Sequence, residues 1–131
     1  MNGKYFLDTN IFVYSFNNQN KSKQKKAQKL ISQALMERLG IVSFQVVQEF
    51  INVMTKKIAV PLSTKDCLAY IDEIFEPLCE VYPDMETYKK AIHIQEETGY
   101  SFYDALIVSA ASKAGCKIIY SEDLMGIRET V

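Results

Sequence analysis

Residues 4–10 read Lys4-Tyr5-Phe6-Leu7-Asp8-Thr9-Asn10, a short apolar run that passes directly into polar residues. The aromatic and aliphatic residues predict a buried strand at 4–7. The polar residues that follow are typical of a helix start, and a helical segment is predicted over 10–16. Asp8 therefore stands where the first strand ends and the first helix begins.

Strand-like and helix-like stretches alternate along the rest of the chain. Further strands are predicted at 41–44, 78–82 and 117–120. Helices are predicted at 21–38, 45–57, 84–97 and 102–113, with another beginning at Ser63. This alternation favours an α/β fold in which a parallel sheet is covered by helices on both faces. Because 48% of the residues are hydrophobic, the chain can bury one core, and we expect a single domain over 1–131.

Composition narrows the class of protein. The formal net charge of −1 gives no overall attraction to nucleic acid. No apolar run approaches the roughly 18 residues of a membrane-spanning helix, and residues 4–7 are too short for a signal peptide. Cys67, Cys79 and Cys116 form no C-x-x-C pair, which favours reduced core thiols over disulfides or a zinc site. We expect a soluble, cytoplasmic protein with no membrane contact.

Two acids are predicted at one edge of the sheet. Ligands of open parallel sheets bind outside the carboxyl ends of the strands. Asp8 directly follows the first strand, and Asp123 lies shortly after the last one. Each also has a plainer interpretation: Asp8 can be a helix N-cap, and Asp123 a loop or capping acid whose role Glu122 could take.

Asp104 also admits two interpretations. Ser101 and Asp104 fit a capping box like that of Ser63 and Asp66. At about 100° per residue, however, Asp104 points into an apolar arc that includes Ile107. An aspartate on a buried helix face is rare unless it is paired or bound to a cation, so its surroundings favour a functional role.

Glu49 borders the apolar stripe of its predicted helix, where a half-exposed surface acid is the plainer interpretation. Carboxylates gathered at one place repel each other unless a cation offsets their charge. Oxygen ligands suit Mg²⁺ or Mn²⁺. A zinc site is not favoured, because His93 is the single histidine and the three cysteines lie far apart in the sequence. Such an ion supports phosphodiester hydrolysis by activating a water and holding a phosphate oxygen.

Other chemistries have less support. With one histidine, a Ser-His-Asp or Cys-His arrangement is not favoured, and neither G-x-x-x-x-G-K-[ST] nor G-x-G-x-x-G occurs. A lysine-rich stretch offers local positive charge, although a solvated helix face is its plainer interpretation. The candidate RNA contacts in this stretch are Lys21, Lys23, Lys25 and Lys26.

Four segments resemble the PIN-domain family, especially its bacterial VapC-type toxin ribonucleases, in order and spacing over roughly residues 1–125. They are Asp8-Thr9-Asn10, Gln48-Glu49-Phe50, Phe102-Tyr103-Asp104-Ala105-Leu106-Ile107 and Ser121-Glu122-Asp123-Leu124. The resemblance implies metal-binding catalytic acids at Asp8, Glu49, Asp104 and Asp123. It also implies supporting polar residues at Thr9, Asn10 and Ser121.

The resemblance implies further properties as well. These are a three-layer α/β/α sandwich, Mg²⁺- or Mn²⁺-dependent endoribonuclease activity on RNA, a homodimer, and a cognate antitoxin that inserts into the site. One departure concerns the end of the sheet. Relatives usually continue past the Ser121 segment into another short strand, whereas this chain stops at Val131, so a final strand could be lacking.

Two other functions stay open. One is a phosphoryl-transfer protein that uses the aspartate after the first strand. It is disfavoured because Asn10 stands where a phosphatase pattern has a second Asp. In addition, the Lys that such proteins carry after the last strand is not found at that place. The other is a non-catalytic RNA- or partner-binding domain of the same fold, which an intact set of acids makes less favoured.

Overall fold

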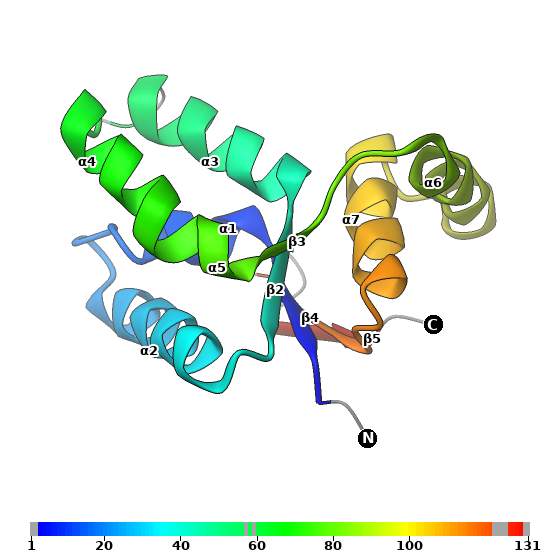
Figure 1. Ribbon diagram of the computed structural model, residues 1–131, viewed down its shortest axis with the longest axis horizontal. Helices are drawn as coiled ribbons and strands as arrows, with labels where there is room; N and C mark the ends of the chain where they lie inside the picture. Colours follow the sequence, from blue (N-terminus) through cyan, green and yellow to red (C-terminus); the bar gives the residue numbers. More distant parts are fainter. Residues whose placement is uncertain (1–2, 57, 59, 122–125, 130–131) are drawn as a thin grey trace.

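The computed structural model describes residues 3–56, 58, 60–121 and, for the backbone, 126–129 (Figure 1). In this part of the chain a five-stranded sheet has the order β3-β2-β1-β4-β5. The strands are β1 (Tyr5–Leu7), β2 (Gly40–Ser43), β3 (Cys79–Val81), β4 (Ile118–Ser121) and β5 (Gly126–Glu129). The first four in chain order run parallel, and β5 is antiparallel to β4.

Helices cover both faces of the sheet. They are α1 (Thr9–Tyr14), α2 (Lys21–Glu37), α3 (Phe44–Lys56), α4 (Thr64–Tyr70), α5 (Glu76–Leu78), α6 (Met85–Thr98) and α7 (Phe102–Lys113). In Figure 1, α1 to α5 lie to the left of the sheet, and α6 and α7 lie to its right. The expected α/β/α sandwich is therefore confirmed. No helix in the described ranges has the length and apolar character needed to cross a bilayer.

β1 forms the centre of the sheet because all its residues are buried and it pairs on both sides. Just beyond it, the backbone N–H of Asp8 donates to the carbonyl of Tyr120 at 3.0 Å. The end of β1 is thereby joined to the end of β4.

On the other side of β1, α2 packs closely on β2. A Cβ at Gly40 would lie 2.3 Å from the Cβ of Ala34, which explains the glycine there.

A cluster of aromatic side chains joins the helical segments of the α1 to α5 layer. The ring centroid of Phe75 lies 4.9 Å from that of Phe12 on α1 and 5.0 Å from that of Phe50 on α3. Tyr70 stacks on Phe50, and burial raises the pKa of Tyr70 to about 12. Because Phe75 packs against both α1 and α3, it stabilises their relative position next to the site described below.

The segment before β3 differs from the sequence prediction. The strand expected over 78–82 is present as β3, one residue shorter at each end. Before it, Ile71–Phe75 forms a π-helical turn and Pro77 lies in the short helix α5. α4, the π-helical turn and α5 follow one another without a break from 64 to 78. Pro77 therefore belongs to the last helical turn before β3.

The suggestion that a final strand could be lacking is wrong. The backbone of Gly126–Glu129 pairs with β4 in the register Ile118↔Glu129 to Ser121↔Gly126. A parallel neighbour would have needed a long crossover, whereas an antiparallel strand can return after a short connection. Cys67, Cys79 and Cys116 form no disulfide in the described part of the chain, and Cys67 and Cys116 are buried, as expected for core thiols.

Candidate functional site

Asp8 is held from two sides at the end of β1. Its side chain caps α1, since Oδ1 accepts a hydrogen bond from the Thr9 backbone N–H at 2.7 Å. The hydroxyl of Ser121, buried at the end of β4, donates to Oδ2 at 3.0 Å. The capping interpretation of Asp8 is therefore correct. It does not exclude a second role, because a carboxylate oxygen has lone pairs beyond the one that each donor uses.

Glu49 is oriented by two polar neighbours. It lies on α3, which begins directly after β2. The hydroxyl of Thr9 donates to its Oε1 at 2.6 Å, and Nε2 of Gln45, one turn earlier, donates to its Oε2 at 3.2 Å. Because Thr9 is also the residue whose N–H Asp8 caps, one buried threonine links the two acids.

Asp104 stands in the first turn of α7. Its backbone N–H donates to Oγ of the N-cap Ser101 at 3.2 Å, so the predicted capping hydrogen bond is present. The expectation that Asp104 lies on a buried face is wrong, because its side chain is exposed while Ile107, one turn later, is buried. A helical wheel gives the direction in which a side chain points but not how deeply it is buried. In the first turn of a helix, no preceding turn covers the side chain.

An open cavity of about 370 Å³, here called the acidic cavity, brings these residues together. Its lining consists of Asp8, Thr9, Asn10, Gln45, Glu49, Asn52, Val53, Tyr103, Asp104 and Ile107. Three acids thus face one space, and the described lining contains no Lys, Arg or His. Asp123 and Glu122 lie outside the described residues, so their part in the site stays a prediction.

The donor chemistry of the acidic cavity fits a hard divalent cation. Carboxylate, amide and hydroxyl oxygens line it without a thiol or an imidazole, which is the donor set that Mg²⁺ or Mn²⁺ takes. Within the described ranges, no group of three or more His, Cys, Asp or Glu side chains is arranged to hold a metal. Asp8, Glu49 and Asp104 therefore share the space without forming a closed set of ligands.

Three lining residues with polar groups were not singled out from the sequence. Gln45 donates from Nε2 to Glu49 and also, at 3.4 Å, to the carbonyl of Tyr103, so it connects α3 with α7. Its i, i+4 spacing to Glu49 was the available signal. Tyr103 directly precedes Asp104, and its exposed side chain lines the cavity. Asn52 lies one turn beyond Glu49 on α3.

The lysine-rich stretch lies apart from both the acidic cavity and the aromatic cavity described below. Lys21, Lys23, Lys25 and Lys26 are exposed on the first turns of α2 and belong to the lining of neither. Nζ of Lys23 lies 5.0 Å from the ring centroid of Tyr14. Their role as RNA contacts stays a prediction.

Comparison with known proteins identifies the family. The family model described as PIN domain matches residues 5–129, so the chain belongs to the PIN-domain family. A crystal structure of Mycobacterium tuberculosis VapC20, described as a sarcin-ricin loop cleaving toxin, is similar with a TM-score of 0.66 and 16% identity. The match covers 90% of this chain and 88% of that one, and at this identity it shows a shared fold. The search of curated protein sequences found no match.

Proposed function

We propose that the protein is a metal-dependent endoribonuclease that hydrolyses phosphodiester bonds of RNA. The observation that carries the proposal is the acidic cavity, in which three carboxylates from separate segments meet beside the ends of parallel strands. A phosphate group would be repelled by such a cavity unless a cation lay between them. Membership of the PIN-domain family supports the same chemistry.

The proposed cofactor is Mg²⁺ or Mn²⁺. Asp8, Glu49 and Asp104 would hold it, with Asp123 as the predicted fourth acid. When bound, such an ion lowers the pKa of a water and polarises a phosphate oxygen. The chain's own polar groups position the acids: the Thr9 N–H and the Ser121 hydroxyl orient Asp8, while the Thr9 hydroxyl and Gln45 orient Glu49. Carboxylates restrained in this way lose less entropy when a cation binds.

The biological setting is proposed from similarity. VapC20 is described as a toxin that cleaves the sarcin-ricin loop, and it shares the fold of this chain. We therefore propose that this ribonuclease is the toxin of a toxin–antitoxin pair, acts in the cytoplasm as a homodimer, and is inhibited by a cognate antitoxin that inserts into the acidic cavity. Co-purification with the product of a neighbouring reading frame would test the pairing.

The alternative is a PIN-fold domain that binds RNA or a partner without cleaving. One observation favours it, namely that the acids in the described part of the chain do not form a closed three-ligand group. The two functions differ in their response to metal. Only the nuclease needs a cation to act on RNA.

The decisive experiment measures cleavage of a mixed-sequence RNA with Mn²⁺, with Mg²⁺ and with EDTA. Wild-type protein should cleave with metal and not with EDTA. Asp8→Asn should reduce cleavage by orders of magnitude without unfolding the protein. Its amide can still accept from the Thr9 N–H and donate to the Ser121 hydroxyl, so chiefly the charge is lost.

The matched control is Asp72→Asn, which removes the charge of an exposed acid that lies outside the acidic cavity. This variant should cleave like the wild type. Equal cleavage by Asp8→Asn and wild type, or cleavage that persists in EDTA, would reject the metal-dependent nuclease. RNA binding without any cleavage would support the alternative domain.

A further inference from the structure

A second open cavity, of about 500 Å³, lies beside the acidic cavity and shares Gln45 and Tyr103 with it. We call it the aromatic cavity, because five aromatic side chains line it: Phe44, Tyr82, Tyr88, Phe102 and Tyr103. Its described lining contains no charged residue, unlike the acidic cavity. The two neighbouring spaces therefore suit different parts of one ligand. The aromatic cavity suits a neutral part, and the acidic cavity suits a phosphate once the proposed cation is bound there.

The aromatic rings form two walls. Phe44 and Tyr82 form one, with ring centroids 5.7 Å apart. Phe102 joins Tyr88 and Tyr103 in the other, with centroid distances of 6.5 and 5.6 Å. Tyr82 is 57% exposed and Tyr103 64% exposed, although large aromatic side chains bury most of their surface in a finished core. Exposed aromatic faces of this kind stack on planar nucleobases.

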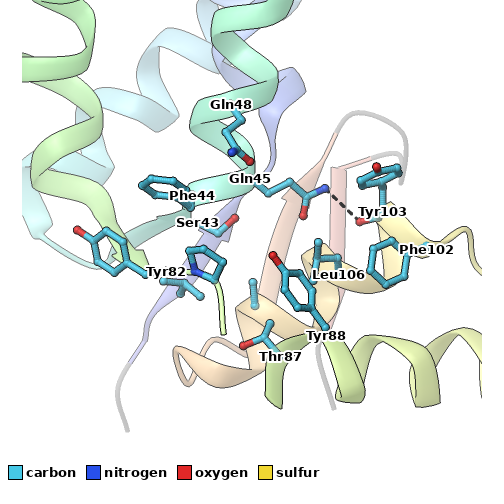
Figure 2. A pocket seen from close by; sticks show the side chains of 13 residues that line it. Ser43, Phe44, Gln45, Gln48, Tyr82, Thr87, Tyr88, Phe102, Tyr103 and Leu106 are labelled. Carbon is cyan, nitrogen blue, oxygen red and sulfur yellow. Dashed lines mark hydrogen bonds between the residues drawn. The ribbon is translucent and has the colours of Figure 1, made fainter. Parts of the chain in front are cut away.

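Two buried polar atoms between these walls have no hydrogen-bond partner among the residues that the structure describes. They are Oγ of Ser43, a residue only 3% exposed, and Oε1 of Gln45. Figure 2 shows both side chains between the Phe44 and Tyr82 wall and the wall with Tyr88 and Phe102. The orientation of the Gln45 amide is determined, because its Nε2 donates to the two acceptors Glu49 and the Tyr103 carbonyl.

Buried polar atoms without partners destabilise a fold, so they call for an explanation such as a ligand that completes them. Gln45 Oε1 accepts a hydrogen bond, and the Ser43 hydroxyl can donate one. The hydrogen-bonding edge of a nucleobase presents an N–H donor beside an acceptor, which is the complement of this pair. A phosphate has only acceptor oxygens when it is ionised and cannot serve Gln45 Oε1.

We propose that the aromatic cavity binds one base of the RNA, adjacent to the phosphate that the acidic cavity acts on. This inference rests on the proposed ribonuclease function and adds a base-recognition site to it. Gln45 joins the two sites: its Nε2 donates to Glu49, and its Oε1, which has no partner in the described part of the chain, would accept from the base. Ser43, Phe44 and Tyr82 are then specificity residues that touch the substrate without touching the acids.

The test is a binding experiment that needs no cleavage. Uniformly ¹⁵N-labelled full-length protein is titrated with AMP, CMP, GMP and UMP, and with ribose 5-phosphate, which lacks the base. At least one nucleotide should shift the amide resonances of Ser43, Gln45 and Tyr82 in two-dimensional NMR spectra. Ribose 5-phosphate should leave these resonances unchanged at the same concentration.

Variants then locate the site. Tyr82→Ala should weaken nucleotide binding by roughly fivefold to a hundredfold, as expected for one lost stacking partner. Ser43→Ala should weaken it by roughly twofold to tenfold without unfolding the protein, because the hydroxyl has no partner to lose. Leu68→Ala, on α4, is the control: Leu68 is 58% exposed, almost the same as Tyr82, and lies outside the lining of both cavities, so binding should not change.

Three outcomes would overturn the inference. Ribose 5-phosphate could shift the same resonances as strongly, Tyr82→Ala could bind like the wild type, or the resonances could move with protein concentration rather than with nucleotide. The last would mean that a second copy of the chain occupies the cavity. RNA cleavage without base binding would remove only this inference, whereas base binding without cleavage would remove only the proposed nuclease.

Discussion

Two helix starts in this protein share one local motif and differ in what surrounds it. α4 begins with Ser63 and Asp66, and α7 begins with Ser101 and Asp104. In each, the serine hydroxyl oxygen accepts from the backbone N–H of the aspartate, at 3.1 and 3.2 Å. The serine ψ angles are 160° and 159°, and both aspartates are exposed. By local geometry alone the two starts are equivalent.

Their neighbours across the fold are not equivalent. Asp104 faces the acidic cavity with Asp8 and Glu49. Asp66 borders a smaller cavity of about 230 Å³ with a mostly apolar lining, in which Glu73 is the other acid. The capping hydrogen bond is the same at both helix starts, so it does not indicate whether the aspartate has a function. Substitutions at the two starts can therefore separate capping from chemistry.

The largest difference is expected in RNA cleavage. Asp104→Asn should lower single-turnover cleavage in Mn²⁺ by orders of magnitude, because it removes one of the negative charges proposed to hold the cation while keeping the backbone cap. Asp66→Asn should cleave nearly as well as the wild type. Circular dichroism establishes that both variants are folded. Similar activities in the two variants would mean that Asp104 is only a capping residue.

The next difference concerns metal binding. Added Mn²⁺ should raise the melting temperature of the wild type and of Asp66→Asn. A ligand that binds only the folded state stabilises that state by about 2.7 kcal/mol when the ligand concentration is a hundred times the Kd. Asp104→Asn should respond less, because the shared charge is reduced. Melting by differential scanning fluorimetry with and without millimolar Mn²⁺ measures this. Equal responses in all three proteins would disprove a shared carboxylate site.

A smaller effect is expected on stability, and here the two starts should behave alike. Ser63→Ala and Ser101→Ala each remove one helix cap, so each should lower the free energy of unfolding by about 1 kcal/mol. Urea denaturation measures the change. Cleavage should fall only in Ser101→Ala, whose cap positions Asp104. If Ser63→Ala impaired cleavage equally, loss of stability and not loss of position would explain both.

The smallest effect should be on RNA affinity without metal. Asp104→Asn should bind RNA about as well as the wild type or slightly better, since one source of repulsion for phosphate is removed. Asp66→Asn should show no change. Fluorescence anisotropy of labelled RNA in EDTA, at one fixed salt concentration, measures both. A large loss of affinity in Asp104→Asn would make this residue an RNA-binding contact and not a metal ligand.

The sequence predicted the order of strands and helices well, but it predicted the burial of individual side chains poorly. The caps at Ser63 and Ser101 were foreseen because their hydrogen bonds join residues three apart. The exposure of Asp104 was not foreseen, since it depends on which element lies over the first turn of α7. Gln45 was overlooked for the same reason: its bond to the Tyr103 carbonyl spans 58 positions.

What the sequence determined by itself is local: the strand that ends at Asp8, the caps of the helices, and the segments that carry the candidate acids. Helix caps and apolar periodicity involve residues only a few positions apart, so they can be predicted from the sequence. Only the tertiary structure decided that Asp8, Glu49 and Asp104 line one cavity. It also decided that one buried polar atom each of Ser43 and Gln45 finds no partner among the described residues beside it. Those arrangements arise when the sheet and the helices pack, because packing brings together side chains that lie far apart in the sequence.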